Sequence, residues 1–145
     1  MVDRTLFCAP FAADAVLTID APPPPMAAQV AEALGAGIHF SQQNAEHTDF
    51  ADGTFDLVVT NALLHETALQ AIHNIMGECH RVLRKGGVMV HAEQPQFEGM
   101  DLFKAFTHDW DSYNNNEPFW GTVHDLDLEA LASGAGFARA NIFQT

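Results

Sequence analysis

Short apolar runs alternate along this chain with segments that have a helical repeat. Strands are expected at 15–20, 37–46, 55–60, 88–93 and 138–143, and helices at 26–35, 67–85 and 125–136. The run "FDLVVT" at 55–60 is almost continuously apolar, which is typical of a strand buried on both faces in a parallel sheet.

The segment 67–85 has the clearest helical pattern. Apolar residues recur there at steps of three and four and form one stripe, made of Leu69, Ile72, Met76, Cys79 and Leu83. The three basic residues in 81–85 complement the negative end of the helix dipole. Gly86 and Gly87 then supply a stop signal, so we expect the helix to end before the strand at 88–93.

Strands that alternate with helices predict an α/β fold with a mostly parallel sheet and flanking helices. The 145 residues suffice for one domain, 1–145, with a core of its own. Ligands of such sheets bind outside the carboxyl ends of the strands. Polar residues stand at or just past four of these ends, namely Asp20, Asn44 with Glu46, Asn61 with His65, and Glu93. The sequence therefore predicts a ligand site at this edge.

The segment 95–123 is rich in aromatic and acidic residues and reads as irregular. It stands after the strand at 88–93, where a cap over the ligand edge would be placed. His108, Trp110, Tyr113 and Trp120 would then give the cap apolar walls and polar anchors for a substrate. The alternative is a loop that docks its aromatic residues into the core, and the sequence leaves both readings open.

The net charge of the chain limits the kinds of partner that it can bind. The chain has 19 acidic against 6 basic residues, a formal net charge of −13. Such a surface repels phosphate backbones, so we expect no nucleic acid partner and favour a small molecule that is neutral or cationic. No apolar run is long enough to span a bilayer, and no membrane partner is expected. The two cysteines lie far apart, which favours a reducing cytoplasmic setting, and the eight histidines show no metal-binding spacing.

The stretch "FADGTFDLVVTNALLHE" at 50–66, followed by "ECHRVLRKGGVMVHAE" at 78–93, resembles class I S-adenosylmethionine-dependent methyltransferases. The likeness extends over about 15–143. It implies a Rossmann-like fold, S-adenosylmethionine as cofactor, and "AVLTID" as the family's second strand.

Carried over by position, the resemblance gives cofactor roles to five residues. Asp20 would bind the ribose hydroxyls, Asn44 with Ala45 would meet the adenine, and Thr60 and Asn61 would line the cleft near the methyl group. Plainer readings stand beside these roles, because Asp20 also suits a turn and Asn44 suits a loop that bonds its own backbone.

His65 lies where general-base histidines can lie in this family. A histidine takes up protons near neutral pH and suits that catalytic role. The alternative is that His65 and Glu66 simply begin the helix at 67–85, where a carboxylate is favoured by the dipole.

The amino-terminal segment departs from the family pattern. Residues 1–15 contain no glycine, whereas the family carries a glycine-rich turn after its first strand. "RTLFCA" is too close to "AVLTID" for a parallel crossover, which needs a dozen or more residues. We therefore expect a domain truncated at the amino terminus and at the last strand, with a gap beside the second strand that a homodimer or the amino-terminal segment fills.

These features predict a methyltransferase that acts on a small molecule. The alternative is a methyltransferase-like relic that is inactive as this chain and serves as an oligomerising or binding module. The absent glycine motif favours the relic, and the intact segment 50–93 favours the enzyme.

Overall fold

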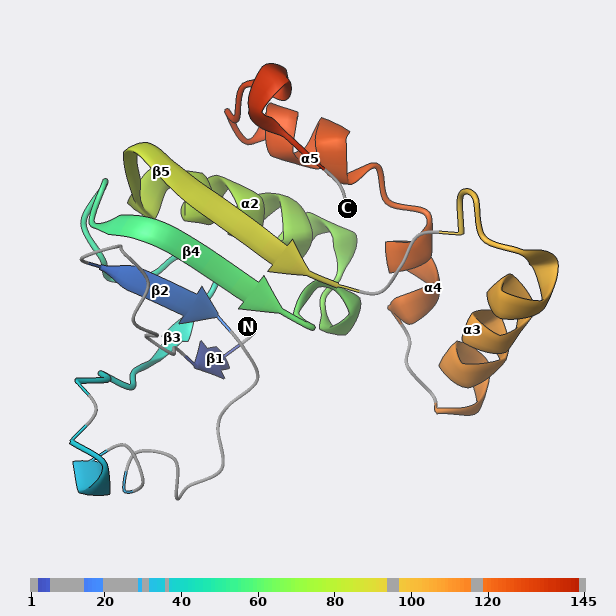
Figure 1. Ribbon diagram of the computed structural model, residues 1–145, viewed down its shortest axis with the longest axis horizontal. Coiled ribbons are helices and arrows are strands. Elements are labelled where there is room, and N and C mark those ends of the chain that lie inside the picture. Colours follow the sequence, from blue (N-terminus) through green and yellow to red (C-terminus); the bar gives the residue numbers. More distant parts are fainter. Residues whose placement is uncertain are drawn as a thin grey trace.

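A computed structural model shows a small parallel sheet with one long helix against it (Figure 1). It describes residues 3–5, 15–19, 29, 32–35, 37–93, 97–115 and 119–143. The strands are β1 (Asp3–Thr5), β2 (Val16–Ile19), β3 (Gln42–Asn44), β4 (Phe55–Asn61) and β5 (Leu83–Ala92). The helices are η1 (Leu64–Glu66), α2 (Leu69–Val82), α3 (Leu102–Asn114), α4 (Trp120–His124), α5 (Leu128–Gly134) and η2 (Arg139–Asn141).

The main sheet has the order β2-β4-β5, and both of its pairs are parallel. Val16 lies opposite Leu57, and Asn61 lies opposite Ala92. The expected α/β fold of the Rossmann-like type, with a mostly parallel sheet and flanking helices, is confirmed.

The gap expected beside the second strand is absent from the described sheet. Strand β2 pairs directly with β4 from Val16 to Ile19. Strand β1 pairs antiparallel with β3 and so stands outside the parallel sheet. The expectation of a strand over 37–46 was wrong in extent, because only the three polar residues of β3 form one.

Helix α2 covers one face of the sheet. Its buried side chains pack with Leu17, Ile19 and Val58 of the strands. The buried stripe of α2 consists of Ala71, Ile72, Ile75, Met76, Glu78, Cys79 and Val82. The prediction that Leu69 belongs to this stripe was wrong, since Leu69 is 46% exposed.

The junction between α2 and β5 is shorter than predicted. The helix ends at Val82, and Leu83 is already extended, with φ −74° and ψ 133°. The register moves from Leu83 opposite Phe55 to Val88 opposite Leu57, which marks an irregularity in the pairing. Residues 83–87, expected to form the helix end and its stop, therefore begin the strand.

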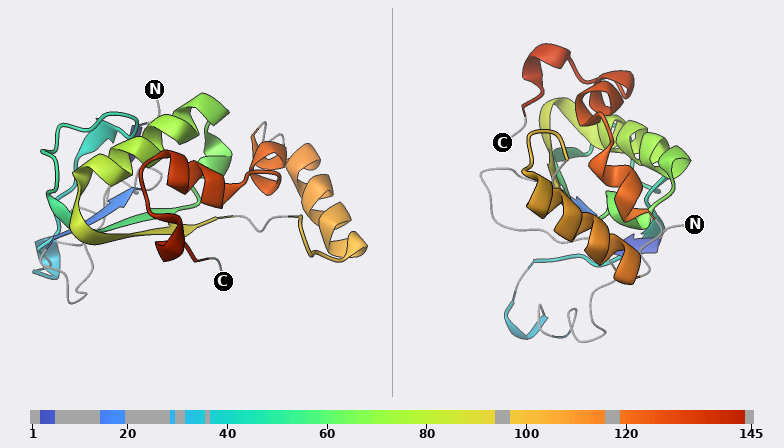
Figure 2. Two further views of the ribbon diagram at one scale, coloured as in Figure 1. Left: turned by 90° about the horizontal axis from the view of Figure 1, so that it is seen from above. Right: turned by 90° about the vertical axis from the view of Figure 1, so that its right-hand side faces the viewer.

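The carboxyl-terminal third is helical. Helices α3 and α4 lie beyond the ends of β4 and β5 (Figures 1 and 2). The irregular structure expected for 95–123 was wrong for the described residues, which form α3 and α4. Asp101 caps α3 by accepting from the backbone N–H groups of Phe103 and Lys104. The strand expected at 138–143 is replaced by η2 at Arg139–Asn141.

Candidate active site

The ligand edge is formed where β4 and β5 end. Strand β4 ends at Asn61, strand β5 ends at Ala92, and Glu93 follows directly. Because the two strands are parallel and adjacent, both ends lie at the same edge of the sheet. Asn61 is exposed there.

The chain turns sharply at Ala62. This residue has φ 49°, a left-handed conformation that a residue other than glycine seldom adopts. Its N–H donates to the Ala92 carbonyl at 2.9 Å, so the turn is held by the end of β5. Strained backbone of this kind often accompanies functional sites, and here it delivers η1 to the ligand edge.

His65 and Glu93 form a buried pair at this edge. His65 Nδ1 lies 2.5 Å from Glu93 Oε1, and Glu93 Oε2 accepts the Leu64 N–H at 2.7 Å. The side chains are 7% and 4% exposed, respectively. One carboxylate thus joins the end of β5 both to the backbone of η1 and to the imidazole that η1 carries.

The His65 ring also contacts Trp120 of α4. The ring centroids are 5.2 Å apart and the planes lie at 87°, an edge-to-face contact. Glu66 Oε1 is 3.7 Å from His65 Nε2. Trp120 Nε1 is buried and has no hydrogen-bond partner among the residues that the structure describes.

A second histidine lies beneath the edge. His91 Nδ1 contacts the Thr60 hydroxyl, and His91 Nε2 lies 2.9 Å from Met76 Sδ. Burial lowers the pKa of His91 to about 4, although the charge of nearby Glu93 acts in the opposite direction. His91 is therefore neutral at neutral pH and serves the packing of β5 against α2.

Of the predicted cofactor residues that the structure describes, one is exposed at the ligand edge and the others are buried or bonded within the chain. Asn61 is exposed at the edge, whereas Thr60 is 2% exposed and bonded to His91. Asn44 Oδ1 accepts the Glu46 N–H at 3.1 Å, and Ala45 is buried in the core. Asp20 lies outside the described residues.

The predicted substrate residues do not form one group in the structure. Of the four, Trp120 is brought to His65, while the His108 ring contacts His124 at 5.6 Å. Trp110 and Tyr113 are 57% and 85% exposed on α3. Their substrate roles stay predictions.

Glu93 is the residue whose role the sequence did not assign. Its place after a strand was a visible signal, but its pairing with His65 was not. That pairing depends on the turn at Ala62. An alanine does not indicate a left-handed conformation in the sequence, so the turn could not be predicted.

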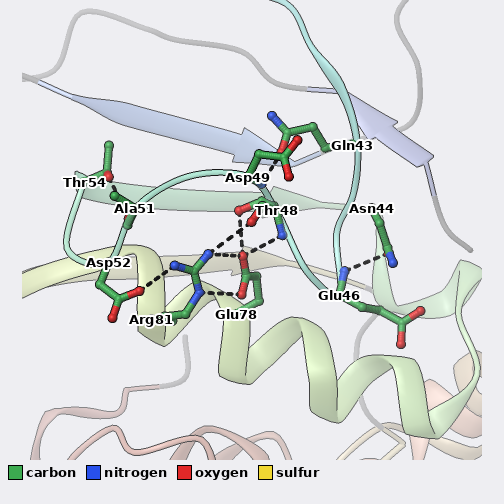
Figure 3. A network of polar contacts seen from close by, with 10 residues as sticks. All are labelled: Gln43, Asn44, Glu46, Thr48, Asp49, Ala51, Asp52, Thr54, Glu78 and Arg81. Atoms are coloured by element: carbon green, nitrogen blue, oxygen red, sulfur yellow. Dashed lines mark hydrogen bonds and ion pairs between the residues drawn. The ribbon is translucent and has the colours of Figure 1, made fainter.

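A second polar network lies between the loop before β4 and helix α2 (Figure 3). Glu78 accepts from Arg81 and from both the N–H and the hydroxyl of Thr48, and Arg81 also binds Asp52 at 2.6 Å. Burial raises the pKa of Glu78, but the hydrogen bonds from Arg81 and Thr48 outweigh burial and lower it to about 2. The network ties the loop before β4 to α2 and has a structural role.

Further features bear on ligands. A cavity of about 480 Å³ is lined by Glu98, His124, Asp125, Leu126, Asp127, Glu129 and Arg139, and it does not include the ligand edge. No group of three or more histidine, cysteine or acidic side chains in the described part of the chain has a geometry that could hold a metal ion. None of the described helices is long and apolar enough to cross a membrane.

Comparison with known proteins identifies similar sequences. The model of a family described as "Methyltransferase domain" matches residues 5–91. An uncharacterized methyltransferase of Synechocystis sp. is 33% identical over 104 residues, which cover 68% of this chain and 45% of that protein. The chain thus spans less than half the length of the curated relative that it matches.

Proposed function

Because the chain belongs to the class I S-adenosylmethionine-dependent methyltransferase family, we propose that it transfers a methyl group from S-adenosylmethionine to a small molecule. The donor would supply an electrophilic methyl group. The chain itself would contribute the positioning of the acceptor and a catalytic histidine, His65.

The observation that carries this proposal is the buried pair of His65 and Glu93 at the carboxyl ends of two parallel strands. Removing an ionisable pair from water costs free energy that the pairing does not always recover. Such a pair at the ligand edge of an α/β sheet is therefore a candidate for catalysis. The left-handed turn at Ala62 supports the same interpretation.

The described residues do not complete a site for the donor. The side chain of Thr60 faces the core, Ala45 is buried, and the Asn44 side chain holds its own turn. Asn61 is exposed at the edge. Asp20, proposed to bind the ribose, thus becomes the residue on which donor binding most depends.

Charge supports a neutral or cationic acceptor of low molecular weight. With 19 acidic and 6 basic residues, the chain would repel polyanions. Figure 1 places α3 and α4 beyond the ends of β4 and β5, and Trp120 contacts His65. We therefore assign the acceptor side of the site to α4 and η1.

A second candidate function is a non-catalytic binding module with the methyltransferase fold. The specific observation in its favour is that Asn44 and Thr60 use their side chains for internal hydrogen bonds. On this reading His65 and Glu93 would be inherited architecture, and the chain would bind no donor.

Calorimetric titration of S-adenosylhomocysteine into the 145-residue chain separates the two functions. The enzyme proposal expects saturable binding that Asp20→Ala weakens by ~1–3 kcal/mol, the cost of unpaired buried polar groups, which is roughly a 5- to 150-fold loss of affinity. Asp111→Ala, on exposed α3, is the matched control and should leave the affinity unchanged. Absence of binding at millimolar ligand would reject the enzyme proposal in favour of the binding module.

A further inference from the structure

We propose that two copies of this chain pair by a reciprocal contact, in which the aromatic face of α3 in one copy covers the open face of strands β4 and β5 in the other. This inference goes beyond the proposed function, because it holds whether or not the chain binds a methyl donor. Its basis is that the chain carries two apolar surfaces of complementary kind, one on a helix and one on a sheet.

The first surface is the face of the sheet that points away from α2. Val58 belongs to the core against α2. Side chains alternate between the two faces of a strand, so Leu57 and Val59 point to the opposite face. Val88 lies opposite Leu57 and Val90 lies opposite Val59, which places them on that same face. Val88 and Val90 are 56% and 45% exposed, and this part of the sheet is therefore open.

The second surface is the outer side of α3. Phe103, Phe106, Trp110 and Tyr113 recur at steps of three, four and three residues and form one stripe along the helix. All four are exposed, and the rings of Phe106 and Trp110 lie 6.0 Å apart. The buried side chain of α3 is that of Ser112. The helix thus packs a polar side against its own chain and presents its aromatic side outward, as an interaction surface does.

The two surfaces do not meet within one chain. Helix α2 lies against one side of the sheet, and α3 lies beyond the ends of β4 and β5 (Figures 1 and 2). An apolar sheet face is stabilised when a helix covers it, and an apolar helix face needs such a layer in turn. A second copy supplies both. Twofold symmetry makes the contact twice, because each copy gives its helix and receives the other.

Charge favours the same arrangement. Strand β5 begins with Arg84 and Lys85, which are two of the six basic residues and are both exposed. Arg84 pairs with Asp56, whereas no ion pair of Lys85 occurs within the described part of the chain. The exposed Asp109 stands next to Trp110 on α3. A basic strand start and an acidic helix are thus complementary between copies.

A membrane surface fits α3 less well than a second copy. Helices that lie in a membrane interface carry lysine and arginine on their polar side. Helix α3 has one lysine, Lys104, against two aspartates, Asp109 and Asp111. We therefore commit to a second copy of this chain as the occupant.

Sedimentation velocity of the full chain tests the part played by the sheet. The double variant Val88→Thr and Val90→Thr keeps β-branched side chains, which suit a strand, but makes the open face polar. We expect it to weaken the dimer several-fold, as Phe103→Gln does from the helix side. Leu34→Gln is the control, because Leu34 is an exposed apolar residue outside both surfaces. Backbone amide spectra show whether each variant folds. A folded sheet variant that dimerises like the wild type would overturn the proposal.

Mixing the two kinds of variant tests reciprocity. A mixed dimer of the Phe103→Gln chain and the sheet variant keeps one contact intact and places both changes in the other. Changes within one contact are not additive, so the mixed dimer should be several-fold tighter than the geometric mean of the two homodimers. An affinity equal to that mean would show that α3 and the sheet do not touch across the dimer.

The contact itself is observed by nuclear Overhauser effects between a labelled and an unlabelled copy. We expect them between the ring protons of Phe103 or Phe106 and the methyl groups of Val88 or Val90. Effects only among the α3 rings of the two copies would overturn the proposal, as would a monomer at every concentration that binds phosphatidylcholine vesicles or nothing. Failure of S-adenosylhomocysteine to bind would instead reject the proposed function and leave this result standing.

Discussion

Single residues at the ligand edge combine structural and chemical tasks. Glu93 bonds the backbone of η1 through one oxygen and His65 through the other. The catalytic interpretation and the position of η1 thus depend on the same carboxylate.

The lowered pKa of His91 predicts that the stability of the chain depends on pH. Its pKa in the folded chain is about 4, below the ordinary value of 6.5, so the unfolded chain binds this proton at higher pH. The free energy of unfolding should therefore fall as the pH is lowered from about 6.5 to about 4, by as much as ~3 kcal/mol from this residue. Urea unfolding at several pH values measures the slope.

Two variants isolate this effect. His91→Gln should flatten the slope between those pH values, whereas His73→Gln, at an exposed position of α2, should retain it. An unchanged slope in His91→Gln would assign the pH dependence to other groups.

The hydrogen bonds of Glu78 give a second prediction for a single residue, which concerns stability. Glu78→Ala removes the shared acceptor of Thr48 and Arg81 in a side chain that is 5% exposed, and should lower the free energy of unfolding by ~1–3 kcal/mol. Glu46→Ala is the control, because its contact with Asn74 is also made to α2 but is exposed. Chemical denaturation that gives equal losses for both variants would refute the structural role of the network.

At the scale of elements, the sequence predicted the strands and helices whose own residues show a periodic pattern or a capping residue. Strand β4 has a nearly continuous apolar run, α2 has a helical repeat, and α5 begins at the capping residue Asp127. The carboxyl ends of the strands followed from the parallel order. That order is confirmed for β2, β4 and β5.

The remaining elements depend on neighbours that the sequence does not show. The segment 138–143 has apolar residues, yet η2 forms there and Phe143 is 82% exposed. Helix α3 was missed because its aromatic residues point to solvent, so its repeat marks no core. The pairing of His65 with Glu93 required both the register of β4 and β5 and the turn at Ala62.

The start of β5 gives a prediction at the element scale. A methyl group on Gly87 would meet the Arg84 and Asp56 carbonyl oxygens at 3.0 Å and Leu83 Cδ2 at 2.9 Å. Gly87→Ala should therefore destabilise the chain by ~1–3 kcal/mol through overpacking. Thermal unfolding measures this loss.

Gly77 is the matched control within α2, where an added methyl group meets nothing within 4 Å. Gly77→Ala should stabilise the chain by ~0.5–1 kcal/mol, because alanine loses less backbone entropy in a helix. Effects of the same sign in both variants would contradict the described junction of α2 and β5.

At the scale of the whole molecule, exposed apolar surface predicts self-association. The outer side of α3 carries Phe103, Phe106 and Trp110, which are 74%, 57% and 57% exposed. Contiguous surfaces of this kind mark interaction sites. We expect a concentration-dependent dimer in sedimentation velocity, weakened several-fold by Phe103→Gln and unchanged by Lys104→Gln. A monomer at every concentration would exclude the homodimer.

The central claim is that the ends of β4 and β5 lie at the edge of the sheet where a methyltransferase brings its donor and its acceptor together. Its most direct test follows backbone ¹H–¹⁵N signals while S-adenosylhomocysteine is added to the whole chain. We predict saturable shifts that cluster at residues 61–66 and 92–93. Shifts confined to the cavity around Asp125 and Arg139, or no shifts at all, would contradict the assignment of the site.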